Sequence, residues 1–378
     1  MSCTNNKKVI DLAQFLNYAS AKTISIETPN LNHIIPEKVI EDISFIKLQT
    51  TRECFISHIH QIEFYKELIY ILDGFNIIYI FKLNGEYVNK IKHIGKGPGE
   101  YTKISKFRIQ NDTIVIGDTK ICKIINYSLE GDFLEEHRLD FNFRDFGTTN
   151  RFYCLYDDNR NDKRGYKSKL LYFDKKNYEL NRAFFNYDKH QEYRTNNFYK
   201  YNDKLRFTHG MDPYIYEVED SLLIPVYKID FGKYNYNKDI PFVCDMFDDE
   251  QYGKSNICTF PDNFVENEQY LFFKYLRGFF LSFVYYDKAK NICYSLSRCV
   301  LRDRNILSLV AMKSPKSTYG NKFVGVLSAD EILNKDLPRN EFSSIDLEGK
   351  FKQLRTQVNQ NDNPVLVLYS INVNQNWY

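Results

Sequence analysis

Apolar and polar residues alternate in short runs in the first half of this chain, and each run ends at a turn signal. Between Ile91 and Leu139 the runs are Ile104–Ile109, Thr113–Ile116, Cys122–Tyr127 and Phe133–Leu139. The residues that separate them, Asn111-Asp112, Gly117-Asp118 and Gly131, favour tight turns. Period-two alternation bounded by such turns predicts β-strands. Four strands this close together in sequence are typical of one β-propeller blade.

A neighbouring segment repeats this pattern. Leu68–Ile91 aligns with Thr113–Glu136 at an offset of about 45 residues, a repeat length found in propellers. In both segments an aliphatic strand ends in an aspartate, Asp73 or Asp118, and a second strand ends in an aromatic residue before a glycine turn. The repeat therefore predicts an all-β propeller.

Three motifs carry a family resemblance. They are GKGPGEY at Gly95–Tyr101, the D-x4-I-x-I-F-x-x-x-G strand pair before it with F-x-I-x-N-D after it, and NPVLVLY at Asn363–Tyr369. With these motifs the chain resembles the six-bladed β-propeller family of bacterial lipoproteins, which have NHL-like repeats. The match is best over residues 60–140. The resemblance implies an exported six-bladed propeller with four-stranded antiparallel blades, and it implies little about activity.

The remaining strands can be assigned to six blades in order. Blade one spans His58–Ile94 and blade two Ile104–Leu139; blade three contains Phe152–Tyr156 and Leu170–Phe173; blade four contains Leu205–Thr208, Tyr214–Val218 and Leu222–Phe231; blade five contains Gln269–Tyr275, Phe279–Tyr286 and Ile292–Leu296; and blade six contains Leu307–Met312, Lys322–Leu327 and Val365–Ile371. Blade six then lacks one strand. We expect the N-terminal strand Ile43–Leu48 to join it and close the ring, because an open ring would expose strand edges.

A small helical insertion, residues 328–363, interrupts blade six. Ser328 and Glu331 have the spacing of a capping box. Leu347, Phe351, Leu354 and Val358 recur on one helical face. We expect this face to pack against the rim of the blade; a lid over the channel mouth is the alternative.

Residues 38–378 are predicted to form a single propeller domain, and residues 1–37 an N-terminal tether. Cys3 follows Met1-Ser2 and precedes a polar stretch, which is consistent with the lipid attachment site of a bacterial lipoprotein whose apolar signal region lies upstream of Met1. The alternative is a cytosolic protein with an isolated cysteine. The first interpretation predicts an extracytoplasmic protein, lipid-anchored to the outer membrane or periplasmic, that meets the membrane only through this anchor.

Composition narrows the classes of partner. The 378 residues include 30 Tyr and 30 Phe, which suit strands packed face to face. The net charge is only +2, so no overall field draws the protein to nucleic acid, and no nucleic-acid partner is expected. The most apolar stretch, Tyr270–Tyr286, is interrupted by Lys274 and Arg277 and cannot be a membrane-spanning helix.

GKGPGEY is the first candidate for binding chemistry. A P-loop requires GxxxxGK[ST] leading into a helix, whereas Pro98 and the strand after Tyr101 exclude that arrangement. The structural interpretation is a tight turn that joins two blades. If the loop binds a ligand, Lys96, Glu100 and Tyr101 supply the donors and acceptors.

The other candidate side chains are two aspartates and two histidines. Asp73 and Asp118 could form a pair of carboxylates, but an aspartate repeated at equivalent strand ends is better explained by turn hydrogen bonds. His58 and His60 lie two residues apart, on one face of a strand, at a spacing that a metal ion could use. No third ligand is identifiable, so they are weak metal candidates.

Cysteine spacing predicts neither zinc sites nor a readable disulfide pattern. Apart from Cys3, the cysteines are Cys54, Cys122, Cys154, Cys244, Cys258, Cys293 and Cys299, and they form no CxxC motif. Several lie in apolar strands, where a thiol acts as a small hydrophobic group. We expect no cofactor, and leave open a structural or channel cation such as calcium.

Three functions are compatible with these features. The first is a binding propeller that recognises a glycan, peptide or protein at one end of the central channel, an inference from fold class and export. The second is a hydrolase or lyase that uses the central funnel, with or without a bound cation. The third is a structural subunit of a surface complex. No catalytic residues can be assigned from the sequence.

Overall fold

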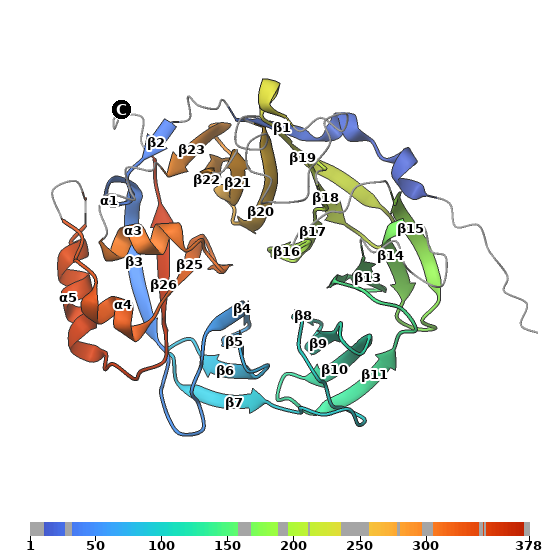
Figure 1. Cartoon of the computed structure of the whole chain (residues 1–378), viewed down its shortest axis with the longest axis horizontal. Helices are drawn as coiled ribbons and strands as arrows, with labels where there is room; N and C mark the ends of the chain where they lie inside the picture. Colours follow the sequence, from blue (N-terminus) through green and yellow to red (C-terminus); the bar gives the residue numbers. More distant parts are fainter. Residues whose placement is uncertain are drawn as a thin grey trace, which may run out of the picture. The chain divides into compact units, whose positions relative to one another are not determined.

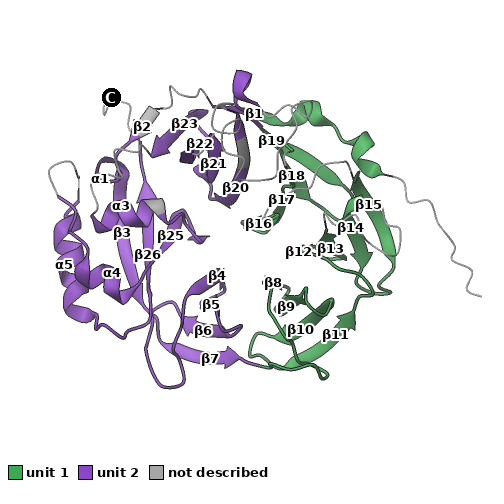
Figure 2. Cartoon of the chain, viewed as in Figure 1, with its two compact units in different colours: residues 1–23, 93–228 green, residues 24–92, 229–378 purple. Residues whose placement is uncertain are grey.

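The computed structural model describes residues 11–26, 32–157, 168–187, 196–210, 212–235, 257–277, 280–296, 305–339, 343 and 345–373. The fold is a six-bladed β-propeller of antiparallel, four-stranded blades with few helices, as the repeat predicted (Figure 1). Cys3, Cys244 and Cys299 lie outside the described residues. The chain divides into two compact units, residues 1–23 with 93–228, and residues 24–92 with 229–378 (Figure 2).

The first unit carries blades two and three and most of blade four. Blade two contains β8 (Lys106–Gln110), β9 (Thr113–Asp118), β10 (Lys123–Ser128) and β11 (Phe133–Arg138). Blade three contains β12 (Asp145–Thr148), β13 (Phe152–Tyr156), β14 (Ser168–Asp174) and β15 (Leu180–Asn186). Blade four contains β16 (Phe198–Tyr201), β17 (Lys204–Phe207), β18 (Tyr214–Val218) and β19 (Leu223–Asp230). The predicted strands of blade two differ from the observed ones by at most two residues at any end.

The second unit carries blades one, five and six. Blade one contains β4 (Ile59–Tyr65), β5 (Leu68–Asp73), β6 (Ile78–Lys82) and β7 (Tyr87–Ile91). Blade five contains β20 (Cys258–Glu266), β21 (Tyr270–Arg277), β22 (Phe280–Asp287) and β23 (Ile292–Leu296). Blade six contains β24 (Ser317–Tyr319), β25 (Lys322–Leu327), β26 (Val365–Ile371) and β3 (Ile40–Lys47).

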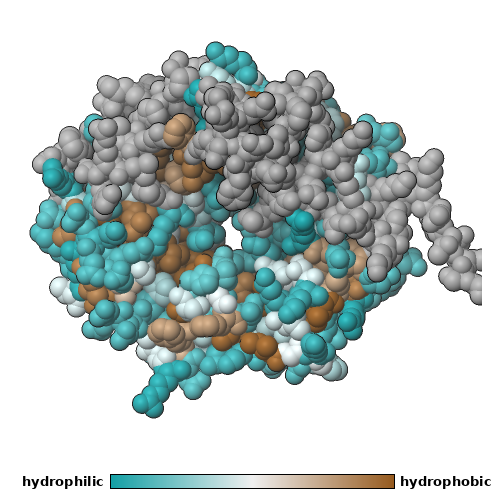
Figure 3. All heavy atoms as spheres, in the orientation of Figure 1, coloured by the Kyte–Doolittle hydropathy of each residue, from teal (hydrophilic) through white to brown (hydrophobic). Residues whose placement is uncertain are grey.

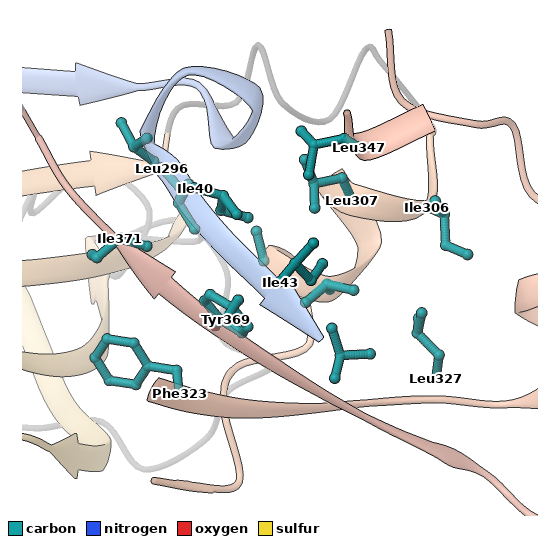
Figure 4. Packing of buried hydrophobic residues seen from close by; sticks show 14 of the residues in the cluster. Ile40, Ile43, Leu296, Ile306, Leu307, Phe323, Leu327, Leu347, Tyr369 and Ile371 are labelled. Carbon is teal, nitrogen blue, oxygen red and sulfur yellow. The ribbon is translucent and has the colours of Figure 1, made fainter. Parts of the chain in front are cut away.

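The predicted closure of blade six by an N-terminal strand is confirmed. β3 pairs antiparallel with β26 along its length, from Val365 opposite Lys47 to Ile371 opposite Ile40, and it forms the outer edge of the sheet. The two strands are held by a cluster of buried side chains that includes Ile43, Phe323 and Tyr369 (Figure 4). Burial of aliphatic and aromatic side chains on this scale is the main force that holds the two chain ends together.

One predicted strand of blade six is wrong. Residues 307–312 belong to a helix, α3 (Ile306–Met312), whose N-cap Asn305 accepts a hydrogen bond from the backbone N–H of Ser308. Ile306, Leu307, Val310 and Ala311 are buried, which is a helical spacing. A short, continuously apolar run does not distinguish a buried strand from a buried helix. Here the N-cap residue Asn305 at its start favours the helix.

Four inner strands, β12, β16, β20 and β24, and the outer strand β15 are absent from the prediction. β24 has only three residues, and β20 contains Pro261 and two register shifts against β21. Proline cannot donate a ladder hydrogen bond, and it is confined to strand edges and bulges. β20 and β24 therefore lack the regular alternation on which the prediction depended.

The helical insertion agrees with the prediction. It contains α4 (Ala329–Asn334) and α5 (Leu347–Gln357) between β25 and β26. Ser328 and Glu331 form a complete capping box. The Phe351 ring lies 5.0 Å from the Phe45 ring of the outer strand β3, and Lys350 donates a 2.8 Å hydrogen bond to the Ile43 carbonyl. α5 therefore packs against the rim of blade six, and its apolar face is buried.

The segment predicted as a tether is structured over much of its described length. Its elements are η1 (Leu12–Phe15), η2 (Tyr18–Ser20), β1 (Lys22–Ser25), β2 (Asn32–Ile34) and α1 (Pro36–Val39). β1 extends the sheet of blade four next to β19, and β2 pairs in parallel with β23 of blade five. Strand pairing therefore begins before the predicted domain start at residue 38. The sequence did not predict β1 and β2, because strands this short show no clear alternation of apolar and polar residues.

Candidate functional site

The GKGPGEY loop is closed by its own backbone. The Gly95 N–H donates to the Tyr101 carbonyl, and the Tyr101 N–H donates to the His93 carbonyl, both at 2.9 Å. Gly99 has a φ of +68°, and a Cβ atom there would lie 2.9 Å from the Phe133 ring. The loop therefore needs glycine for its turn and its close packing, as the structural interpretation requires.

A buried lysine fills the inside of this loop. Lys123 is only 3% exposed, and its ammonium donates to the carbonyls of Gly97 at 3.1 Å and Glu100 at 3.0 Å. Its charge is balanced by Glu136, 2.5 Å away, whose carboxylate also accepts the Gly99 N–H at 2.7 Å. Sequence reasoning missed Lys123, because it lies at the start of an apolar strand where its side chain gave no signal.

The three candidate ligands in the loop have different surroundings. Tyr101 is fully buried, and the Glu100 carboxylate accepts the Gly97 N–H at 2.8 Å. A Cβ atom at Gly95 would lie 1.9 Å from that carboxylate, so the glycine provides its space. Lys96 is exposed. Two of the three side chains thus support the loop itself.

Asp118 and Asp73 both accept backbone N–H groups in the turns that follow their strands, and Asp118 also accepts two from the connection before β8. The two Asp118 oxygens accept from Thr102, Lys103, Lys120 and Ile121 at 2.6 to 3.3 Å. Asp73 Oδ1 accepts from Phe75 at 2.9 Å and Ile77 at 3.0 Å, whereas its buried Oδ2 has no partner among the described residues. These contacts correspond to the turn role that the repeat favoured over a catalytic one.

His58 and His60 are in contact, with ring centroids 4.3 Å apart. The His58 ring also lies against Gly74, where a Cβ atom would be 2.4 Å from its Cε1 atom. Among the residues that the structure describes, no three His, Cys, Asp or Glu side chains are grouped so that they could hold a metal ion.

The cysteines that the structure describes are in the reduced, thiol form: Cys54, Cys122, Cys154, Cys258 and Cys293. Burial raises the pKa of Cys54 to about 11 and that of Cys293 to about 12. At neutral pH these two thiols are protonated, and a protonated thiol is a poor nucleophile and metal ligand. They act as small hydrophobic groups, Cys293 within the strand β23 and Cys54 in the connection before β4.

A groove on the described surface combines polar and apolar side chains. It has a volume of about 640 Å³ and lies at blade six, between the turn that joins β24 to β25 and the turns of its neighbours in the same unit. Its lining residues are Glu41, Ser44, Ile46, Leu83, Gln269, Tyr319, Gly320, Asn321, Lys322, Leu368 and Ser370. This volume is within the range of small-molecule sites.

Register explains why these residues share one surface. Ser44 pairs with Leu368, and Asp42 pairs with Ser370, so the four side chains lie on the same face of the blade six sheet. Further along that face, Val324 and Leu366 are buried against the core of blade one. The groove begins where the residues of this face are no longer covered by the core. There the apolar side chains of Ile46 and Leu368 lie beside the hydroxyl groups of Ser44 and Ser370.

The groove was not detectable from the sequence. Its lining comes from separate segments between residues 41 and 370, and it contains no local motif. On the molecular face shown in Figure 3, hydrophilic residues predominate over the described surface, and hydrophobic residues form small areas between them. No described helix is long and apolar enough to cross a membrane.

Comparisons with known proteins identify relatives of this chain. Its fold is similar to that of a protein from Bacteroides fragilis NCTC 9343 whose name describes it as exported, with 21% identity and a TM-score of 0.73 over 93% of this chain and 100% of the other. It is also similar to a member of the DUF4221 family from Bacteroides vulgatus ATCC 8482, with 11% identity and a TM-score of 0.50 over 89% and 99%. At these identities the likeness concerns the fold alone. A search of curated proteins gave no match.

One family model matches residues 21–370, which is most of the chain, including all six blades. The match begins before β1 and ends within β26, the strand that pairs with β3 to close blade six. The chain therefore belongs to the family described as Domain of unknown function (DUF4934).

Proposed function

We propose that this protein is a binding propeller that acts outside the cytoplasm, and that its ligand site is the groove on blade six. The observation that carries this proposal is the groove itself, where the 37% exposed Tyr319 lies beside amide and hydroxyl side chains over an apolar floor. Sites that bind small molecules combine mostly apolar walls with a few convergent polar groups.

The Asn321 and Gln269 amides and the Ser44 hydroxyl each offer both donors and acceptors to a ligand. By contrast, the Gly99 N–H and the Gly97 and Glu100 carbonyls of the GKGPGEY loop are engaged by Glu136 and Lys123, and of its candidate side chains only Lys96 is exposed. A ligand would have to displace those contacts to bind in the loop. The groove is therefore the better candidate for recognition of a glycan, peptide or protein.

Export and lipid attachment at Cys3 are part of the same proposal. They are supported by the resemblance to exported propeller lipoproteins and by the name of the B. fragilis protein of the same fold. Kinship with NHL-like repeats is supported by Asp73 and Asp118, which follow equivalent strands and cap equivalent turns.

The binding proposal is tested by isothermal titration calorimetry of the purified chain against oligosaccharides and hexapeptides. Tyr319→Ala should weaken binding of the active class by about tenfold, because it removes the exposed ring from the groove. Phe75→Ala is the matched control, since Phe75 is 60% exposed but lies outside the groove. Equal affinities of wild type and Tyr319→Ala for every ligand bound would overturn the assignment of the site.

Localisation is tested by fractionating cells that express the full natural gene and by metabolic labelling with a radioactive fatty acid. Wild type should label and enter the membrane fraction, and Cys3→Ser should lose both properties. Recovery of unlabelled wild type in the cytosol would contradict the lipoprotein proposal.

A further inference from the structure

The groove presents one aromatic ring on a rigid support. Tyr319 and Lys322 pair across the two-residue turn between β24 and β25, and Gly320 in that turn has a φ of +55°. Glycine at the first central position is typical of a tight hairpin turn, which fixes the ring's place. Phe64 of blade one lies 4.9 Å from the Tyr319 ring, so the ring is supported by a second aromatic side chain.

The polar side chains around this ring suit a ligand rich in hydroxyl groups. Ser44, Ser370, Asn321 and Gln269 line the groove, and each side chain can both donate and accept. The floor between them is formed by Ile46 and other aliphatic side chains. A pyranose ring has the matching shape, with an apolar C–H face that can lie on an aromatic ring and hydroxyl groups at its edge.

The charges at the groove exclude a strongly anionic ligand. Lys322 is paired with Asp42 at 2.5 Å, and this hydrogen bond from Lys322 holds the pKa of Asp42 below its usual value. The exposed carboxylate of Glu41 is held by a 3.0 Å hydrogen bond from Asn372. Of the two charged side chains that line the groove, Lys322 is engaged by Asp42, so the carboxylate of Glu41 is the charge that faces a ligand, which favours a neutral or cationic partner.

A peptide that adds a strand to blade six is the main alternative ligand. The sheet of blade six has two edge strands, β24 and β3. β24, which carries Tyr319, has only three residues and offers too short a row of backbone groups, so the edge left for a peptide is that of β3. Lys350 of α5 already donates to the Ile43 carbonyl of β3 at 2.8 Å, and Phe351 packs on Phe45. Because strand addition depends on a free row of backbone groups, this edge does not suit it.

From these contacts we infer that the groove binds a saccharide that is uncharged or carries an amino group, with one sugar ring stacked on Tyr319. This inference rests on the proposed function, and it specifies the ligand class of the same site. It assigns a stacking role to Tyr319, hydrogen-bonding roles to Asn321 and Gln269, and a charge-selecting role to Glu41.

The test is a set of NMR titrations of ¹³C-tyrosine-labelled protein. The probes are a glucosamine trimer, its N-acetylated form, a glucuronate-containing tetrasaccharide, and a mixture of proline-free hexapeptides. We expect the two glucosamine trimers to shift the Tyr319 ring resonance and the anionic tetrasaccharide to leave it unmoved. Tyr319→Phe should keep binding within about threefold, and Tyr319→Ala should lose about tenfold.

Glu41→Gln tests the charge selectivity separately. Glu41 is exposed, so the variant should fold like wild type. It should lower the preference for the amino over the N-acetylated trimer by about threefold without changing affinity for the latter. Asp330→Gln, an exposed acidic position in α4 outside the groove, is the control.

The outcomes separate the two proposals. Hexapeptides that shift Tyr319 while all saccharides leave it unmoved would overturn the saccharide class and keep the groove as the site. Strongest binding by the glucuronate tetrasaccharide would overturn the charge argument and with it this inference. If no probe moves Tyr319 but a probe binds elsewhere, the proposed function loses its site as well.

Discussion

The chain enters blade one through residues 48–58 and blade two through residues 92–105, and both stretches hold backbone groups outside any strand ladder. Residues 48–58 are organised by Asn363, whose side chain accepts the Ile56 N–H at 2.8 Å and donates to the carbonyls of Gln49 at 2.8 Å and Cys54 at 3.1 Å. Residues 92–105 are organised by Lys123 with Glu136, and by Asp118.

The difference shows that the backbone groups outside the strand ladder determine which side chain can pair with them at each connection. One amide can satisfy both an N–H and two carbonyls without a charge, so Asn363 is sufficient at the first connection. The carbonyls of Gly97 and Glu100 need donors only, and an ammonium supplies them; its charge then requires Glu136 nearby. The glycine-rich motif belongs to this second solution and is part of the scaffold.

The largest expected effect is at Lys123. Lys123→Met removes the ammonium, so the Glu100 carbonyl and the Glu136 carboxylate lose this donor and the Gly97 carbonyl keeps only the Glu100 N–H. The free energy of unfolding should therefore fall by about 3 to 4 kcal/mol. Urea denaturation followed by circular dichroism measures it. Lys120→Met, at an exposed lysine close by, is the control and should change stability by less than about 0.5 kcal/mol.

Adding Glu136→Gln to Lys123→Met tests whether charge pairing is the reason for the loss. The double variant should recover part of the stability lost in Lys123→Met, because no uncompensated carboxylate remains. Additive losses from the two substitutions would show that Lys123 acts through its carbonyl contacts alone, and the contrast with Asn363 would then lose its electrostatic part.

The next effect is at Asn363, which is fully buried. Asn363→Ala should lower the free energy of unfolding by about 2 to 3 kcal/mol, because the Ile56 N–H and two carbonyls lose their partner. The control is Asn359→Ala at an exposed position in the same segment. A loss as small as that of the control would show that the closure of blade six does not depend on this amide.

Asn363→Asp gives the same comparison a pH dependence. A protonated carboxyl group can both donate and accept hydrogen bonds, as the amide does. A carboxylate cannot donate to the two carbonyls, and burial disfavours its charge. The folded-state pKa of the introduced aspartate should therefore be raised above about 3.9. A raised folded pKa means that stability is fully present below the unfolded pKa and is lost as pH rises through the folded pKa. Unfolding at pH 4 and pH 7 should therefore differ for Asn363→Asp by more than for wild type.

The regular parts of the fold were predictable, and the irregular parts that build the sites were not. Blades one and two show alternation, turn residues and a repeat, and β3 follows from strand counting. The sequence identified Asn363 as the start of the NPVLVLY motif and the end of the helical insertion, but not as a buried hydrogen-bonding residue, because its partners lie more than 300 residues away in sequence. Likewise the groove joins segments that are adjacent only after the blade closes.

The aspartates that follow equivalent strands give a finer contrast. Asp118 uses both oxygens, accepting the Thr102 hydroxyl at 2.8 Å as well as four backbone N–H groups. Asp118→Asn places an NH₂ group against one set of these donors, whichever way the amide turns. It should therefore cost about 1 to 3 kcal/mol, measured by urea denaturation. A neutral result would mean that the turn rearranges at no cost.

Asp73→Asn should have the smallest effect, because the Asp73 Oδ2 atom has no partner among the described residues. An amide can keep the Oδ1 bonds to Phe75 and Ile77 and turn its NH₂ group to the unpartnered side, while the buried charge is removed. We expect a change in stability of less than about 1 kcal/mol, of either sign. A loss as large as that of Asp118→Asn would reveal a hidden donor at Oδ2, such as a bound water, and would make the two turns equivalent.

The same variant has a second readout at Tyr79. Burial, and after it the charge of Asp73, raise the pKa of Tyr79 to about 12. Asp73→Asn removes the second cause and keeps the first, so the pKa of Tyr79 should fall but stay above the ordinary value of about 10. NMR titration of ¹³C-tyrosine measures it, with Tyr87 of the same blade as internal reference, since its raised pKa owes nothing to Asp73. An unchanged Tyr79 pKa would mean that burial alone raises it and that Asp73 makes no contribution.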